Sequence, residues 1–231
     1  MKTKVITICL ALLIVTLLGA CGKQVSITDD MTPSQTAEAF LEAFKSQDWD
    51  SLDQIYAGKG SDFEAAYGTT EDSDDATNAL RDAFLSKMYE FDYKVEGETI
   101  AEDENTATVD IKTTTYNMVD VFNNFYQEYM EQALDKYTGN SSDMDQKELE
   151  EMAITILQEQ LDSAKKDYKG AASLPMTKTD GKWIVDEIDE NNTGFLNAIS
   201  GGMMDVASDI VNAKTGSGAE KKTKDSTSDD K

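Results

Sequence analysis

The first clear pattern of hydrophobic positions along the chain has a helical period. Four apolar residues are spaced at i, i+3, i+4 and i+7, so they share one face of a helix: Ala37, Phe40, Leu41 and Phe44. Residues 32–35, Thr-Pro-Ser-Gln, precede this face and form a capping box with proline in the first turn. The pattern therefore predicts an amphipathic helix that begins after Thr32.

Two further helices are expected before the first strand. A short helix after Asp48 or Asp50 is expected to end at Gly58 and Gly60. The residues that it turns inward are Trp49, Leu52, Ile55 and Tyr56. Residues 69–75 are polar and acidic and predict a loop. After this loop, the next helical face consists of Leu80, Ala83, Phe84 and Met88.

The period then changes to alternation, which indicates strands. Residues 89–95 alternate between apolar and polar, and so do residues 107–113. In the second run Val109 and Ile111 share one face, and Thr108 and Asp110 share the other. Turn-forming residues lie between the two runs, so they are expected to pair as an antiparallel hairpin.

A second pair of strands is predicted over residues 171–178 and 182–188, because Asp180-Gly181 between them is a strong signal for a two-residue hairpin turn. Residues 117–169, which separate the two strand pairs, return to a helical period with a break near 138–142. They predict two long helices that form an antiparallel helical hairpin.

The pattern becomes weaker toward the C-terminus. A short helix is expected near residues 195–212, although Gly201-Gly202 weakens it. The tail over 214–231 has no large apolar residue and is expected to be disordered.

Together these elements predict one α+β domain over residues 31–213. N-terminal helices are expected to pack on a curved antiparallel sheet of about four strands, with the helical hairpin (117–169) inserted between the middle strands. The expected core contains ten apolar residues: Phe40, Leu41, Phe44, Trp49, Leu80, Phe84, Val109, Ile111, Trp183 and Val185.

The first twenty residues have the organisation of a secretory signal peptide. Two lysines are followed by an apolar stretch over 5–18, which is shorter than the roughly 20 apolar residues that span a bilayer. The box Leu18-Gly19-Ala20-Cys21 resembles the lipobox of bacterial lipoproteins. The resemblance implies cleavage between Ala20 and Cys21 and a diacylglycerol on Cys21, so that residues 21–30 tether the domain to the membrane. An ordinary signal peptide with a chance cysteine, or an anchor helix that is not cleaved, is the alternative.

Composition narrows the chemistry that the chain can perform. It contains no histidine, and its two cysteines are Cys9, inside the signal peptide, and Cys21. Catalysis by Ser-His-Asp or Cys-His is therefore excluded, and the commonest transition-metal ligand is missing. We expect no cofactor and no metal.

The formal charge of −24 limits the partners. Removing residues 1–20 removes two lysines and no acid, so the mature chain is more negative still. Nucleic acid is excluded as a partner because phosphate contacts need Lys and Arg, and anionic lipid head groups repel the chain. The charge favours a neutral, cationic or calcium-rich partner, or it is a solvated coat that keeps the protein soluble. Membrane contact is expected through the lipid on Cys21.

The order of these elements resembles the nuclear-transport-factor-two-like, cystatin-type α+β fold of many small Gram-positive lipoproteins of unknown function. The residues that carry the resemblance are Thr32 to Leu41, Gln47-Asp48-Trp49, Val95 to Thr115, and Asp180-Gly181-Lys182-Trp183-Ile184-Val185. The resemblance implies a sheet curved into a cone. In SnoaL-like enzymes of this family the cone holds catalytic Asp, His or Tyr residues, and no such residue can be placed here. The inserted helical hairpin departs from the family.

Three groups of residues are candidates for binding or catalysis. Two acidic stretches, Glu71-Asp72-Ser73-Asp74-Asp75 and Asp143-Met144-Asp145, could bind calcium but lack the full spacing of an EF-hand, and solvated loops with helix caps are the alternative. The carboxylates Asp186, Glu187, Asp189 and Glu190 crowd the end of the last strand, where a raised pKa would suit a general acid. The aromatic row Phe122, Phe125, Tyr126, Tyr129 and Tyr137 could line a ligand pocket but is expected to be core.

Three functions remain open from the sequence. The first is a non-enzymatic binding or interaction module anchored on the extracytoplasmic face of the membrane. The second is a carrier of a small ligand in the conical pocket, and the third is a SnoaL-like hydrolase or isomerase with an Asp or Glu paired with Tyr. A cone packed solid with side chains would remove the second and the third.

Overall fold

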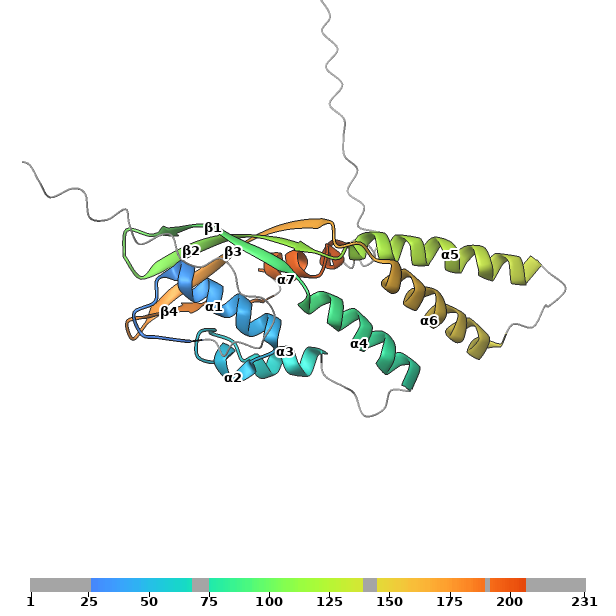
Figure 1. Ribbon diagram of the computed structural model, residues 1–231, viewed down its shortest axis with the longest axis horizontal. Coiled ribbons are helices and arrows are strands. Elements are labelled where there is room, and N and C mark those ends of the chain that lie inside the picture. The colour runs from blue at the N-terminus through green and yellow to red at the C-terminus, as the bar shows by residue number, and fades with distance from the viewer. Residues whose placement is uncertain (1–25, 68–74, 139–144, 190–191, 207–231) are drawn as a thin grey trace, which may run out of the picture.

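The computed structural model describes residues 26–67, 75–138, 145–189 and 192–206 (Figure 1). The predicted signal peptide, the predicted lipobox with Cys21 and the predicted tail over 214–231 lie outside the described residues. The helices are α1 (Pro33–Ser46), α2 (Trp49–Leu52), α3 (Gly60–Tyr67), α4 (Asp75–Tyr89), α5 (Met118–Thr138), α6 (Gln146–Ser163) and α7 (Gly194–Ile199). The strands are β1 (Asp92–Ile100), β2 (Thr106–Thr115), β3 (Tyr168–Thr179) and β4 (Lys182–Val185).

The four strands form one antiparallel sheet in the order β1-β2-β3-β4. Val109 and Ile111 of β2 are buried, whereas Thr108 and Asp110 are exposed, so the predicted register is confirmed. The backbone of Ile55 and Ala57 pairs with Val185 of β4 and covers this edge of the sheet. The predicted fold class, with helices on a four-stranded antiparallel sheet and a helical hairpin between β2 and β3, is confirmed.

Helix α1 begins where the capping box predicts. The Thr32 hydroxyl accepts a hydrogen bond from the Gln35 N–H, and the Gln35 side chain accepts one from the Thr32 N–H. These bonds satisfy N–H groups that the first turn of a helix leaves without a partner. The cap therefore fixes the direction in which α1 enters the core.

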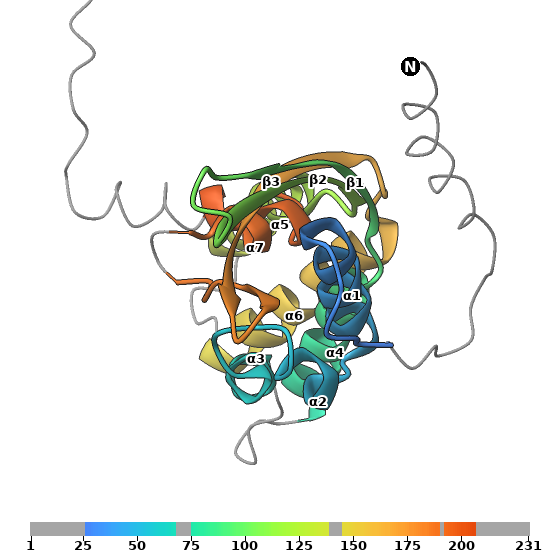
Figure 2. The ribbon, with the colours of Figure 1, turned by 90° about the vertical axis from the view of Figure 1, so that its left-hand side faces the viewer.

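The core fills the space between the curved sheet and the helices α1 and α7, which lie beneath it (Figure 2). Phe40 and Phe44 of α1 and Phe195 of α7 are at most 1% exposed, and their ring centroids lie 5.2 to 6.4 Å apart. Seven of the ten predicted core residues are buried. The other three are half-buried: Trp49 and Phe84 pack at the margin of the core, and Leu80 packs on a second cluster formed by Met118, Val121 and Leu161.

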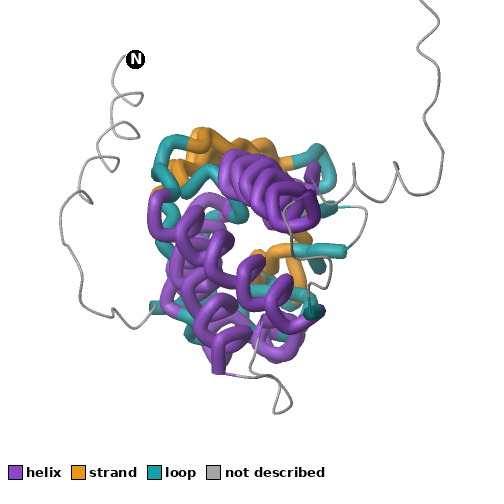
Figure 3. Tube along the Cα trace, turned by 90° about the vertical axis from the view of Figure 1, so that its right-hand side faces the viewer, coloured by secondary structure: helices purple, strands orange, loops and turns teal. Residues whose placement is uncertain are grey.

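The hairpin of α5 and α6 extends from the end of the sheet where β2 ends and β3 begins (Figure 1). Viewed from that end, its helices stand in front of the strands (Figure 3). The two helices lie together near the sheet and diverge toward the tip (Figure 1). The prediction that the aromatic row of α5 is core was wrong: Tyr126 is 63% and Tyr137 77% exposed, while Phe122, Phe125 and Tyr129 are half-buried. Helix α6 lies along only one face of α5, and the two helices diverge toward the tip, so the side chains of α5 that point away from α6 stay exposed.

Three element boundaries also differ from prediction. Gly60 begins α3 rather than ending α2, because its N–H donates to the Asp53 side chain; the helix α3 was not predicted. The first strand begins at Asp92 and runs to Ile100, since Tyr89 still belongs to α4 and the edge strand β1 is too exposed to show clear alternation. Helix α7 ends at Ile199, and helical residues return at 203–206 after the two glycines.

Tyr93 of β1 gives the fold a predicted sensitivity to alkaline pH. Its hydroxyl donates to Glu42 Oε1 of α1 at 2.7 Å, and burial together with this carboxylate raises the pKa of Tyr93 well above its usual value. The folded protein therefore keeps a proton that the unfolded chain loses near pH 10, so stability falls as pH rises through that value. We expect a shallower fall in Tyr93→Phe, measured by urea denaturation at about pH 8 and about pH 11. Equal falls in both proteins would contradict this.

Candidate functional site

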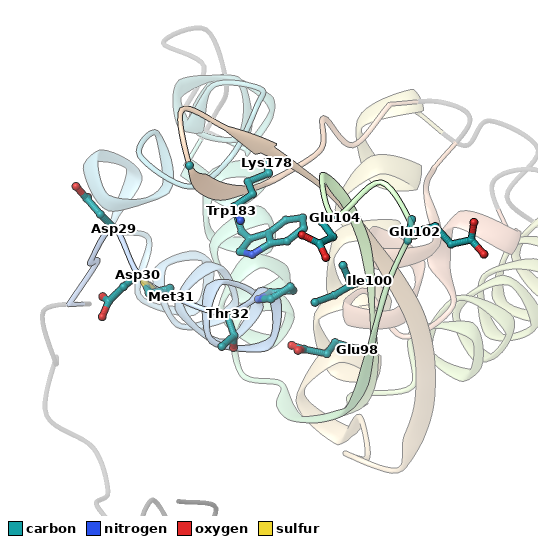
Figure 4. Close-up of a pocket in the computed structure, with 13 residues that line it drawn as sticks. Asp29, Asp30, Met31, Thr32, Glu98, Ile100, Glu102, Glu104, Lys178 and Trp183 are labelled. Atoms are coloured by element: carbon teal, nitrogen blue, oxygen red, sulfur yellow. The ribbon is translucent and has the colours of Figure 1, made fainter. Parts of the chain in front are cut away.

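A cavity of about 650 Å³ opens at the end of the sheet opposite the helical hairpin (Figure 4). Three segments line it: residues 29–33 before and at the start of α1, the β1–β2 turn with the end of β1, and the β3–β4 turn. The indole of Trp183 points across the cavity toward Ile100, and Asp29 and Glu102 lie at its margins (Figure 4). The cavity is thus built where the chain first enters the domain.

Residues within each of the two turns at the cavity stabilise its conformation. Asp180 and Gly181 have φ values of 50° and 86°, as a two-residue turn with two left-handed residues requires. In the other turn Asp103 Oδ1 accepts the N–H groups of Asn105 and Thr106 at 2.9 and 3.1 Å. These bonds hold the pKa of Asp103 below its usual range. They place Glu104, with a φ of 55°, at the tip of the turn.

Helix α1 and the sheet are joined across the cavity. The Ser34 N–H in the first turn of α1 donates to Glu98 Oε2 of β1 at 2.8 Å. A carboxylate at this place is favourable because the N-terminus of a helix carries a partial positive charge. On the other side Lys182 Nζ lies 2.7 Å from Asp29 Oδ1. These contacts connect the first turn of α1 to β1 and the chain before α1 to β4.

The lining combines an apolar floor with an acidic rim. Its apolar members include Met31, Ile100 and Trp183. Its carboxylates are Asp29, Asp30, Glu98, Glu102 and Glu104, against the single lining lysine Lys178. Lys178 Nζ lies 5.3 Å from the centroid of the Trp183 ring, a cation–π distance. The cavity therefore suits a ligand that carries an amine or guanidinium on an apolar stem.

Sequence reasoning missed this cavity. Glu102, Asp103 and Glu104 were assigned only to a turn, and nothing in their spacing relates them to Asp29 or Trp183. Asp29 and Asp30 at the end of the predicted tether were the available signal. They indicate a site only when the fold brings three separate segments together.

The predicted acidic sites lie partly outside the described residues. Residues 71–74, 143–144 and 190 lie outside the described residues, Asp75 begins α4, and Asp145 caps α6. Asp186 is half-buried, while Glu187 and Asp189 are exposed beside Tyr56, whose hydroxyl accepts the Ile188 N–H at 3.0 Å. Burial raises the pKa of Tyr56, and the two carboxylates add to this. In the part of the chain that the structure describes, no group of three or more His, Cys, Asp or Glu side chains is placed to hold a metal ion.

The face of the sheet on which a conical pocket was expected is filled. Leu174, Met176 and Phe91 complete the buried cluster around the Phe40, Phe44 and Phe195 rings. Among the described residues Tyr93 donates a hydrogen bond to Glu42 and Tyr116 donates one to Glu90, and both carboxylates are exposed at the surface. Within the described residues, no helix is long and apolar enough to cross a membrane.

Comparisons with known proteins place the chain in a family. A family model described as "Domain of unknown function (DUF5105)" matches residues 28–199. A search among curated proteins found no match. Among solved structures the chain is similar to one described as "Crystal structure of a putative lipoprotein (ycdA) from Bacillus subtilis subsp. subtilis str. 168", with a TM-score of 0.46 and 13% identity. The likeness covers 71% of this chain and 54% of that chain, so this chain spans about half of the neighbour's length.

Proposed function

Since the chain belongs to the family Domain of unknown function (DUF5105), whose description states no activity, we propose a function from the residues themselves. The protein is a lipoprotein held on the extracytoplasmic face of the membrane by diacylglycerol on Cys21. It acts there as a non-enzymatic binding module, and the cavity at the tether end is its binding site. The observation that carries this proposal is the acidic cavity with its Trp183 floor.

The proposed anchor lies close to the cavity along the chain. Seven residues lie between Cys21 and Asp29 in the cavity wall, and the eight steps from one to the other span at most about 28 Å in a fully extended chain. A diacylglycerol supplies two acyl chains, which hold a protein stably where one chain does not. The proposed site would therefore stay close to the membrane surface.

Cys21→Ala is expected to abolish anchoring. Without the thiol no diacylglycerol can be attached, so the protein should leave the membrane fraction or accumulate with its signal uncleaved. Cell fractionation and immunoblotting of wild type and variant measure this, and inhibition of the lipoprotein signal peptidase should make the wild-type precursor accumulate. A cleaved Cys21→Ala protein that stays in the membrane fraction would refute the anchor.

The cavity is expected to bind spermidine, a probe that carries ammonium groups on methylene stems. In a Trp49→Phe background Trp183 is the remaining one of the chain's two tryptophans, so its fluorescence reports on the cavity. We expect saturable binding that weakens about tenfold in Asp30→Asn/Glu102→Gln/Glu104→Gln, because each exposed ion pair contributes up to about 1 kcal/mol.

The matched control is Glu148→Gln/Glu150→Gln/Glu151→Gln on α6, which removes the same charge at the other end of the molecule and should leave the affinity unchanged. Citrate, an anion of similar size, should not bind. Equal loss of affinity in both triple variants would show that spermidine senses only the overall charge.

The two alternative functions both need room in a cone. A ligand carrier or a SnoaL-like hydrolase would have to accommodate its ligand where Phe40, Phe44 and Phe195 are packed. The likeness to the nuclear-transport-factor-two-like fold remains a proposal, supported by the order of helices and antiparallel strands. The filled core favours the binding module over both alternatives.

A further inference from the structure

A stripe of exposed apolar side chains runs along the outer half of α5. Tyr126, Met130, Leu134 and Tyr137 follow one another at i, i+4, i+8 and i+11, and they are 63, 39, 55 and 77% exposed. Ile100, at the other end of the sheet, is a further exposed large hydrophobic residue. We call these four residues the α5 stripe. Their spacing places them on one face of the helix, which α6 leaves uncovered.

An acidic groove borders this stripe. Its volume is about 600 Å³, and it is lined along α5 by polar and acidic residues that include Glu128, Glu131 and Asp135. Gln160 of α6 closes its inner side and donates to Glu128 Oε2 at 2.9 Å. Glu131 lies three residues before Leu134, a spacing at which side chains are neighbours on a helix surface, so the groove meets the stripe there, while Asp135 lies farther around the helix. Apolar surface and negative charge therefore meet on the same helix.

The charge of the hairpin indicates which kind of partner this surface can bind. Helices α5 and α6 together carry nine carboxylates and two lysines. A second copy would bring the same negative charge against it, and like charges across an interface are unfavourable. Anionic lipid head groups would be repelled in the same way. The hairpin also extends from the end of the sheet opposite the proposed tether (Figure 1).

We propose that the α5 stripe and the acidic groove together form a docking surface for a cationic amphipathic helix of a partner protein. The apolar face of that helix packs on the stripe, and lysines or arginines along one of its edges reach the groove. Helix-on-helix docking of this kind uses anchors at i, i+4 and i+7 spacings, which the stripe offers in complementary form. This surface is separate from the cavity at the tether end, so the two proposals can fail independently.

The probe for the test is a synthetic helical peptide of leucine and lysine, compared with its leucine and glutamate counterpart. The protein is the chain from residue 21 with Cys21→Ser, and binding is measured by fluorescence anisotropy of the labelled peptide. We expect the lysine peptide to bind and the glutamate peptide not to bind. Tyr126→Ser/Leu134→Ser/Tyr137→Ser should weaken binding at least about tenfold, while Thr108→Ala, which shortens an exposed side chain of β2 outside both proposed sites, should not change it.

The variant Glu131→Gln/Asp135→Asn tests the contribution of the groove carboxylates and leaves the stripe unchanged. It should weaken binding at low salt, and its difference from wild type should vanish at about 1 M salt, where the screening length is about 3 Å. Thermal melts of all variants should match wild type, since the changed side chains are exposed. An unchanged affinity of the stripe variant would overturn the proposal. So would dimers in sedimentation that the stripe variant abolishes, or a marked gain in affinity when residues 207–231 are removed, because either result would assign the stripe another occupant.

Discussion

Phe44→Ala is expected to lower the free energy of unfolding by about 3–5 kcal/mol, the usual cost of removing a fully buried phenylalanine. The ring of Phe44 has no exposed surface, and it lies edge-on to the rings of Phe63 and Phe195 at centroid distances of 5.2 and 5.3 Å. Its removal leaves a cavity between α1, α3 and α7 that rigid aromatic neighbours cannot fill. The variant therefore loses the free energy of burying the ring and also bears the cost of the cavity.

Urea denaturation of wild type and variant measures this difference. Tyr126→Ala is the matched control, because it removes an aromatic side chain of similar size that is 63% exposed. The control should change stability by less than about 1 kcal/mol. If Phe44→Ala lowered the free energy of unfolding no more than Tyr126→Ala does, the close packing of Phe44 against α3 and α7 would be wrong.

Gly201→Ala is expected to be the most damaging change of a single glycine. Gly201 has a φ of 64°, and a Cβ there would collide with the backbone carbonyl oxygen of Tyr116, at the base of the helical hairpin. Its own carbonyl accepts the Val119 N–H at 3.3 Å, so the close approach joins the segment after α7 to the start of α5. The left-handed backbone costs an alanine about 1–2 kcal/mol, and forced movement of the backbone should add about 1–3 kcal/mol.

Gly181→Ala provides the control, since Gly181 has a φ of 86° but open space around its Cβ position. It should therefore show the backbone cost alone. Thermal or urea melts of the two variants give the comparison, and the excess in Gly201→Ala measures the packing of α7 against the hairpin base. Equal losses in the two variants would mean that this contact is loose.

The sequence predicted what depends on neighbours along the chain. The capping box at Thr32 and the Asp180-Gly181 turn specify their local structure completely. Val109 and Ile111 revealed which face of β2 is buried, since one face of an antiparallel strand packs on the core. The order of elements and the insertion of the helical hairpin between β2 and β3 followed from these local signals.

What the sequence did not reveal depends on contacts between distant segments. A helical period in α5 identifies an apolar face but cannot say what covers it, so Tyr126 and Tyr137 were assigned to the core. The cavity brings together residues such as Asp29, Glu104 and Trp183 from three segments, and no spacing connects them. Gly60 was expected to stop a helix, although its bond to Asp53 makes it the start of one.

The proposed lipid on Cys21 would decide where the cavity and the hairpin are presented. Mass spectrometry of the protein extracted from membranes tests it most directly. We predict a mature chain that begins at Cys21 and carries the added mass of a diacylglycerol, such as one with palmitoyl chains, on its first residue. An unmodified Cys21, or a chain that begins at another residue, would contradict it.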